Sequence, residues 1–343
     1  MKTPKNPCPD CPSPHPLSRR DFLKQSAATT AAVTAGSIIP VVAEAAKNTG
    51  QSETVVKSLY DSLSDKQRET ICFPFDHALR SRVDNNWNIT ESSVRSFDKD
   101  QQAMIKEIFM GIHSPEYADT VYNQVEHDSG RQGFEGGSSI AIFGEPGTGK
   151  FQFVLTGRHC TRRCDGDSVE GTAFGGPIFY GHAADSFNET KDHPNNAYWY
   201  QALRANEVFE ALDGKQREYA LLQRGRPERG NQTIELTGKK KGLDGIPVSE
   251  MSSDQQDLVK SVLNDLLAPF RETERKESMK YIHENGFENL HMAFYRRGDI
   301  GNDRVWDVWQ LEGPSMVWYF RGAPHVHAWA HIRSKADDDP FAA

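Results

Sequence analysis

The sequence predicts an α+β fold, in which helices pack on a mainly antiparallel sheet and a helical segment precedes that sheet. Apolar residues recur at helical spacing up to about residue 130, whereas the alternating runs typical of strands begin after Gly136. The later strands follow one another at hairpin spacing, which favours antiparallel pairing. We therefore expect a single domain over residues 55–335, helical over 55–130 and sheet-containing over 136–335.

The individual elements follow from the same periodicities. Ile105, Ile108 and Phe109, for example, are spaced to share one face of a helix. The expected helices cover residues 53–72 with a break near Ser64, 98–112, 115–125, 196–212, 214–223, 252–267 and 272–284. The expected strands cover residues 138–143, 151–157, 172–180, 289–295, 304–311, 315–320 and 325–332.

The N-terminus carries an export signal. The twin-arginine motif is matched by Ser18-Arg19-Arg20-Asp21-Phe22-Leu23-Lys24, and a mild apolar stretch follows it. The small-x-small pattern that signal peptidase cleaves is then supplied by Ala43-Glu44-Ala45. We expect residues 1–45 to be removed and residues 46–54 to form a flexible leader. The expected export partner is the twin-arginine translocase, which carries folded proteins, and the expected location is periplasmic or secreted.

Composition excludes several other partners. Pro40 and Glu44 interrupt the apolar stretch, so it is too short and too polar to be a stable membrane anchor. The formal net charge is −8, which argues against nucleic acid or an anionic membrane as a partner, because both attract a basic surface. A small-molecule ligand or substrate is the expected partner.

Signal cleavage decides which cysteines remain in the mature protein. Cys8 and Cys11 leave with the signal peptide, so Cys72, Cys160 and Cys164 remain. An odd number in an oxidising compartment allows at most one internal disulfide. Cys160 and Cys164 flank a turn-like Thr-Arg-Arg segment and form the favoured pair, whereas Cys72 is expected to be a free buried thiol.

A possible phosphate-binding loop spans Gly144 to Lys150. Nucleotide binding by such a loop requires a Ser or Thr after the lysine and a helix beyond it. Here Phe151 follows, and the next residues alternate as in a strand. We therefore expect a Gly/Pro hairpin turn at this position.

The candidate functional residues are histidines associated with the predicted strands. His325 and His327 share one face of the strand 325–332, because alternate residues of a strand point the same way. Two imidazoles in this arrangement can share a divalent cation, although two hydrogen-bonded histidines would give the same pattern. His159 and His182 also follow apolar, strand-like runs. Together these positions predict a shared polar pocket with four metal ligands.

Nearby charged residues suggest what this pocket does. Arg158, Glu312 and Arg321 are the expected catalytic residues, since an arginine can orient an anionic substrate. Neutral imidazoles suit Zn, Cu or Fe, so a divalent transition metal is the expected cofactor. The resulting hypothesis is a metal-dependent oxidoreductase or hydrolase acting on a small anionic substrate. The alternative is a non-catalytic periplasmic ligand-binding protein with the same pocket.

Four motifs follow one another in the chain: Gly157-Arg158-His159, Gly175-Gly176-Pro177-Ile178-Phe179-Tyr180-Gly181, Glu312-Gly313-Pro314 and His325-Val326-His327. From about residue 59 to 332, the sequence with these motifs resembles the exported bacterial family catalogued as domain of unknown function 3500. The resemblance implies a Gly-His-His, a Gly-x-Glu-Pro and a His-x-His. Arg158 replaces the first of these histidines, and His182 stands where the glutamate is expected. The resemblance thus implies a ligand set similar in kind to the family's, and it implies no reaction.

Overall fold

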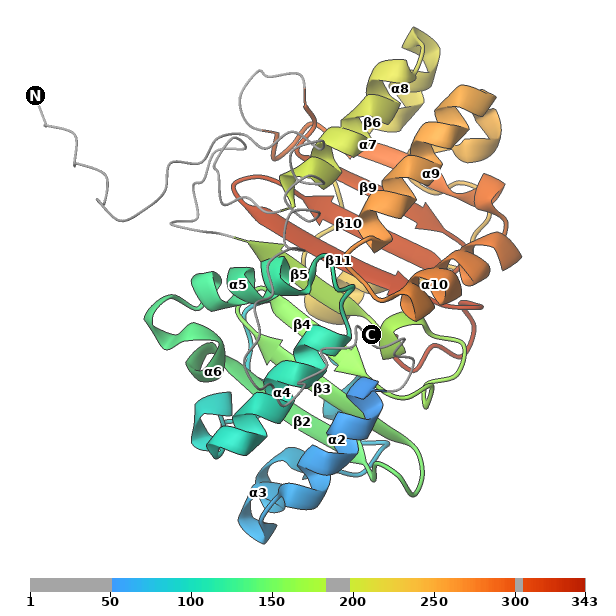
Figure 1. The fold of residues 1–343 in the computed structure, drawn as a ribbon. Helices are drawn as coiled ribbons and strands as arrows, with labels where there is room; N and C mark the ends of the chain where they lie inside the picture. Colours follow the sequence, from blue (N-terminus) through green and yellow to red (C-terminus); the bar gives the residue numbers. More distant parts are fainter. Residues whose placement is uncertain (1–50, 183–197, 300–304, 343) are drawn as a thin grey trace, which may run out of the picture. The chain divides into compact units, whose positions relative to one another are not determined.

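The computed structural model describes residues 51–182, 198–299 and 305–342 of the 343-residue chain (Figure 1). The predicted signal peptide and residues 46–50 of the predicted leader lie outside the described residues. The rest of that leader is the start of a helix, because α2 (Gln51–Ser62) begins inside it.

The described strands form one mixed sheet. Their bounds are β1 (Cys72–Phe73), β2 (Ser138–Gly144), β3 (Phe151–Gly157), β4 (Cys160–Cys164), β5 (Ile178–His182), β6 (Leu221–Leu222), β7 (Ile246–Pro247), β8 (His291–Tyr295), β9 (Val308–Gly313), β10 (Met316–Arg321) and β11 (Val326–Ile332). The strand order is β1-β2-β3-β4-β5-β11-β10-β9-β8-β6, with β7 beside β8. The β1–β2 and β6–β8 pairs are parallel and the others are antiparallel. The fold is therefore mixed α/β with a mostly antiparallel sheet.

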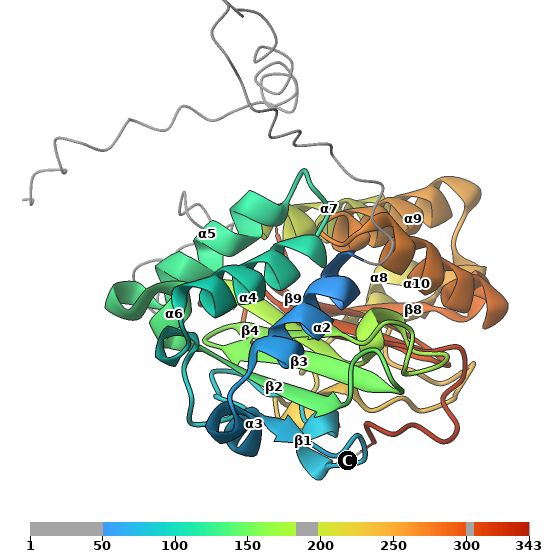
Figure 2. The same cartoon turned by 60° about the horizontal axis from the view of Figure 1, so that its bottom comes forward.

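Helices cover one face of this sheet, as Figures 1 and 2 both show. After α2 they are α3 (Asp65–Ile71), α4 (Lys99–Gly111), α5 (Ala118–Asp128), α6 (Gly133–Gly137), α7 (Trp199–Ala211), α8 (Gly214–Ala220), α9 (Ser253–Leu267) and α10 (Glu272–Glu284). Capping boxes begin α3 at Ser64 and α4 at Asp98, since each N-cap side chain accepts from a backbone N–H that would otherwise lack a partner. The cap at Ser64 explains the break expected there. No helix in the described ranges is long and apolar enough to cross a membrane.

The sheet consists of two halves that meet at the β5–β11 pair. Strands β1 to β5 come from the N-terminal part of the chain and β8 to β11 from the C-terminal part. The core-facing residues of β1 to β4 pack on α2, α4 and α5, whereas those of β5 and of β8 to β11 pack on α7, α9 and α10. The junction pairs His182 with Val326 and Gly181 with His327. We call this junction the seam.

The face opposite the helices is covered by irregular segments. Val83 and Trp87 come from the segment after β1, Ile234 from the segment after β6, and Phe341 from the C-terminal tail. They pack on strand residues such as Trp329, which point away from the helices. This covering brings residues distant in the sequence close to the seam.

The Gly-rich segment before Phe151 is a hairpin turn, as predicted. The register pairs Gly144 with Phe151 and Phe143 with Gln152 across β2 and β3. No helix begins after Lys150, so the feature that a nucleotide-binding loop requires is missing from this described segment. The strand expected over 172–180 is shorter, because Ala173–Gly175 is a 3-10 turn and β5 begins only at Ile178.

The expected pairing of Cys160 with Cys164 is wrong. The Thr-Arg-Arg segment between them is strand β4 rather than a turn, so the two cysteines lie at opposite ends of an extended strand. Four residues of extended chain place their Cα atoms about 13 Å apart, whereas a disulfide needs less than about 7 Å. Both thiols are free and buried, and burial raises the pKa of Cys160 to about 11. Cys72 is free as well, but it is partly exposed.

We expect the denatured mature protein to titrate with about three thiols per chain in the 5,5′-dithiobis(2-nitrobenzoate) assay without prior reduction. In the native protein, Cys160 and Cys164 should react slowly, because a buried neutral thiol is a poor nucleophile. Cys72→Ser should remove one thiol and serves as the control. A result in which two thiols become available only after a reductant is added would contradict this assignment.

Candidate metal centre

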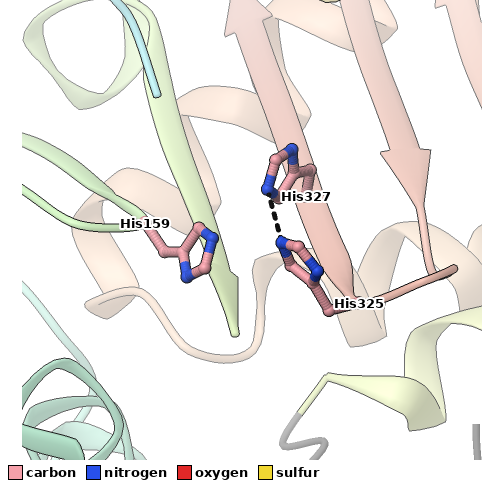
Figure 3. Close-up of side chains that lie close together, drawn as sticks. All are labelled: His159, His325 and His327. Atoms are coloured by element: carbon pink, nitrogen blue, oxygen red, sulfur yellow. Dashed lines mark hydrogen bonds between the residues drawn. The ribbon is translucent and has the colours of Figure 1, made fainter. Parts of the chain in front are cut away.

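Three of the predicted histidines meet at the seam. The ligand nitrogens of His159, His325 and His327 all lie within 4.8 Å of one another, and this group could hold a metal ion. Figure 3 shows His159 facing the two histidines of β11. The Nε2 atoms of His325 and His327 are 3.0 Å apart, and the three side chains are nearly inaccessible to solvent, with exposed fractions of 3, 2 and 5%. We call these residues the three-histidine group.

Strand β11 positions two of the three rings. His325 directly precedes the strand and His327 is its second residue, so both side chains emerge on the same side. Val326 and Ala328 point the opposite way, into the core under the helices. The alternation along β11 therefore matches the sequence-based prediction.

His159 reaches the group from a turn that follows the predicted strand. Strand β3 ends at Gly157, and Gly157 pairs with Cys160. His159 lies in the two-residue turn between these partners, with a φ of +53°. A left-handed conformation is uncommon outside glycine, asparagine and aspartate, but histidine is also enriched there. The turn directs the ring toward the seam.

Gly181 makes room for the rings to meet. It lies on β5, between the hairpin that carries His159 and the residue His327 on β11, with which it is paired. A Cβ atom at this position would lie 2.2 Å from the carbonyl oxygen of Val326 and 3.4 Å from Cδ2 of His159. Only a residue without a side chain fits between the two histidines without displacing β11.

A buried carboxylate orients His159. The Nδ1 atom of His159 lies 2.8 Å from Oδ2 of Asp128, the last residue of α5. Burial alone would raise the pKa of Asp128, but its interactions with His159 and His182 outweigh burial and hold the pKa below its ordinary value. Because Nδ1 is engaged by this carboxylate, Nε2 is the nitrogen of His159 that could serve as a metal ligand.

A second carboxylate orients His327. Its Nδ1 atom lies 2.5 Å from Oε2 of Glu228, which is held in turn by the guanidinium of Arg321. Burial lowers the pKa of His327 to about 4 despite the opposing effect of Glu228. Burial would raise the pKa of Glu228, but the bonds from His327 and Arg321 dominate and lower it to about 2. With this lowered pKa His327 is neutral at pH 7, and its Nε2 atom faces Nε2 of His325 at 3.0 Å.

The four-histidine site that the sequence predicted is divided into two. His182 does not belong to the three-histidine group. It lies with His127 and Asp128, in a second set of potential ligands whose atoms are also within 4.8 Å of one another. The reason is geometric, because His182 pairs with Val326 rather than with His327. Its side chain therefore emerges on the helix-covered face of the sheet, as that of Val326 does.

The three predicted catalytic residues occupy different places. Glu312 lies away from the centre. Across the sheet it pairs with Val317 on β10, which in turn pairs with His331 on β11. His331 is four residues, or about 13 Å, from His327 along β11. The side chain of Glu312 pairs with Arg226 instead, at 2.7 Å.

Arg321 pairs with Glu228, and its guanidinium also contacts Nδ1 of His327 directly, so it helps to hold both the carboxylate and the ring. Arg158 lies in the same turn as His159 and lines a cleft of about 280 Å³. Its Nη1 atom donates to the backbone carbonyl of Asp128 at 3.2 Å. Of the three predicted catalytic residues, Arg158 is thus the one that lines this cleft, which shares Asp128 with the three-histidine group.

Sequence reasoning missed Asp128 and Glu228. An aspartate at the C-terminal end of a helix opposes the helix dipole, so its place at the end of α5 is a weak signal that it has a cationic or proton-donating partner. Glu228 lies in an irregular Gly/Arg/Pro segment and gives no comparable signal.

Comparison with known proteins agrees with the motif pattern. Residues 45–339 match the family described as Protein of unknown function (DUF3500). The chain belongs to this family. The DUF3500 match covers the described sheet, the three-histidine group and both of its carboxylates. No curated protein and no solved structure is significantly similar to the chain.

A second match places a twin-arginine translocation signal over residues 16–36, so this DUF3500 protein is exported from the cytoplasm. The predicted family and the predicted export are both confirmed. The family description names no reaction, and the function must therefore be inferred from the site.

Proposed function

We propose that the protein is an exported metal-dependent enzyme whose centre is the three-histidine group and whose substrate is a small anionic molecule. One observation carries this proposal: three buried imidazoles converge, and two of them are oriented by carboxylates on their distal nitrogens, His159 by Asp128 and His327 by Glu228. Carboxylate–histidine pairs of this kind surround metal ions in proteins, because the carboxylate fixes the tautomer and makes the imidazole a better ligand.

The donor set indicates the ion. Three histidines and one exchangeable ligand form one of the arrangements found at catalytic Zn²⁺ sites. Such an ion would be held by His159, His325 and His327 and would supply Lewis-acid chemistry. Asn85, whose Nδ2 atom is 3.4 Å from Nε2 of His327, is a neutral polar neighbour of the group.

The cleft beside Arg158 supports the choice of substrate. Its lining includes the amides Asn86, Asn88 and Gln132, together with Asp128, which also contacts His159. Its volume of about 280 Å³ suits a small molecule. Arg158 is the one basic residue of this lining, and its guanidinium can donate two parallel hydrogen bonds to a carboxylate or phosphate; the carboxylate of Asp128 in the same lining is paired with His159.

One observation favours a second candidate, a binding protein that holds a metal and a ligand without reaction. The three rings are almost fully buried, and catalysis requires that a substrate reach the ion. Turnover separates the two candidates. An ester or phosphate panel that is hydrolysed by the native protein and not by a His325→Ala/His327→Ala variant supports the enzyme. Thermal stabilisation by the same compounds without turnover supports the binding protein.

Metal analysis tests the centre itself. The mature protein should be exported natively, purified without a histidine tag and analysed by inductively coupled plasma mass spectrometry. We expect the His325→Ala/His327→Ala variant to contain about one transition metal ion fewer per chain than the native protein. His283→Ala, which changes an exposed histidine on α10, is the matched control and should retain the native content. Equal metal contents in the native protein and a folded double variant would rule out the proposed centre.

A further inference from the structure

We infer that the protein has a second metal site, formed by His127, Asp128 and His182 on the helix side of the seam. Their ligand atoms lie within 4.8 Å of one another, and this set shares no ligand atom with the three-histidine group. Two imidazoles and one carboxylate are a donor set that binds Zn²⁺ with a further position open. The inference does not depend on the proposed enzyme activity.

The strongest support is the state of His182. Its side chain is only 3% exposed, and its Nδ1 atom has no hydrogen-bond partner among the described residues. Oδ1 of Asp128 lies 3.0 Å from this nitrogen, within ion-pair distance. A buried imidazole nitrogen without a hydrogen bond is costly. A cation bound between this nitrogen and the carboxylate would satisfy both.

The two oxygens of Asp128 allow both sites to be filled at once. Oδ2 accepts from His159 at 2.8 Å and thereby serves the three-histidine group. Oδ1 lies 3.0 Å from Nδ1 of His182 and is the oxygen on the side of the second ion. The two ions would therefore be linked through the carboxylate and the ring of His159, without a shared ligand atom.

The backbone around this second set favours a cation. His127 and Asp128 lie in the last turn of α5, where the helix dipole presents its negative end. Gln124 of the same helix donates to the carbonyl oxygen of Gly181, which ties the end of α5 to the strand that carries His182. His127 is exposed, with its ring centroid 6.0 Å from that of His182, so an ion has an entry path from solvent.

Zinc titration of the metal-stripped mature protein tests the inference, with bound Zn²⁺ counted by isothermal titration calorimetry and mass spectrometry. We expect about two ions per native chain, and about one in either His182→Ala or His325→Ala/His327→Ala. The exposed His127→Ala should fold normally and bind the second ion at least tenfold more weakly, which keeps the test valid if His182→Ala fails to fold. His283→Ala remains the control.

The variants distinguish failure of this inference from failure of the proposed centre. The second site would be overturned if His127→Ala and folded His182→Ala both bound zinc with native stoichiometry and affinity. This holds whatever the His325→Ala/His327→Ala variant shows. Loss of an ion in these two variants, with none lost in His325→Ala/His327→Ala, would support the second site and overturn the three-histidine centre. A native protein that binds no zinc would overturn both.

Discussion

Asp128→Asn is expected to weaken Zn²⁺ binding at the three-histidine group by about 10- to 100-fold, which is the usual cost of changing a carboxylate that orients a metal-bound histidine. The neutral amide keeps the size of the side chain but removes the negative charge that favours Nδ1–H on His159. The same substitution removes the only carboxylate from the second set of ligands, so both Zn²⁺ affinities should fall. Competition with a chromophoric chelator measures each affinity.

Glu228→Gln is the matched control for this prediction. Glu228 orients His327 but has no part in the set formed by His127, Asp128 and His182. Its substitution should therefore weaken one Zn²⁺ site and leave the other unchanged. If Asp128→Asn altered neither affinity while circular dichroism showed a native fold, the role assigned to Asp128 would be wrong.

Gly181→Ala is expected to lower the free energy of unfolding by about 2–3 kcal/mol, a cost typical of forcing an extra group into a packed interior. The added Cβ atom would lie 2.2 Å from the backbone carbonyl oxygen of Val326, and a backbone atom cannot rotate away as a flexible side chain can. Relief of this clash requires β5 and β11 to separate locally, which also moves His327 away from His159. Chemical denaturation measures the stability, and zinc titration of the folded fraction measures the binding.

Gly214→Ala is the control for that substitution. Gly214 is the first residue of α8, and a Cβ atom there would contact nothing within 4 Å. Because alanine favours helix more than glycine does, this variant should be as stable as the native protein or slightly more so. Equal stability of the two alanine variants would show that the seam tolerates a side chain and would contradict the role given to Gly181.

Local patterns predicted much of the fold. The spacing of Ile105, Ile108 and Phe109 predicted α4, and all three residues are buried in the structure. The alternation along 325–332 predicted β11 and the shared face of its two histidines. These features depend only on residues close together in the chain, and such periodicities are visible in a sequence.

The arrangement of the site depended on contacts that no local pattern encodes. The pairing of Gly181 with His327 decides which histidines meet, and it joins strands from opposite parts of the chain. A shift of one residue in that register would bring His182 to His327 and restore the predicted four-histidine site. Glu312 was misplaced for the same reason, because its strand was correctly expected but its position along the sheet was not.

The seam also has a consequence for the order of assembly. The strands that meet there are separated by most of the C-terminal half of the sequence, and closing so long a loop is entropically costly, so this pairing is expected late in folding. Before it forms, His159 and His327 are far apart and no three-histidine group exists. A metal ion would then be captured only by chains that have completed their fold, and it would act as a cross-link that slows separation of the two halves. Because the twin-arginine pathway carries folded proteins, the ion would be acquired from the cytoplasmic pool and carried out with the protein.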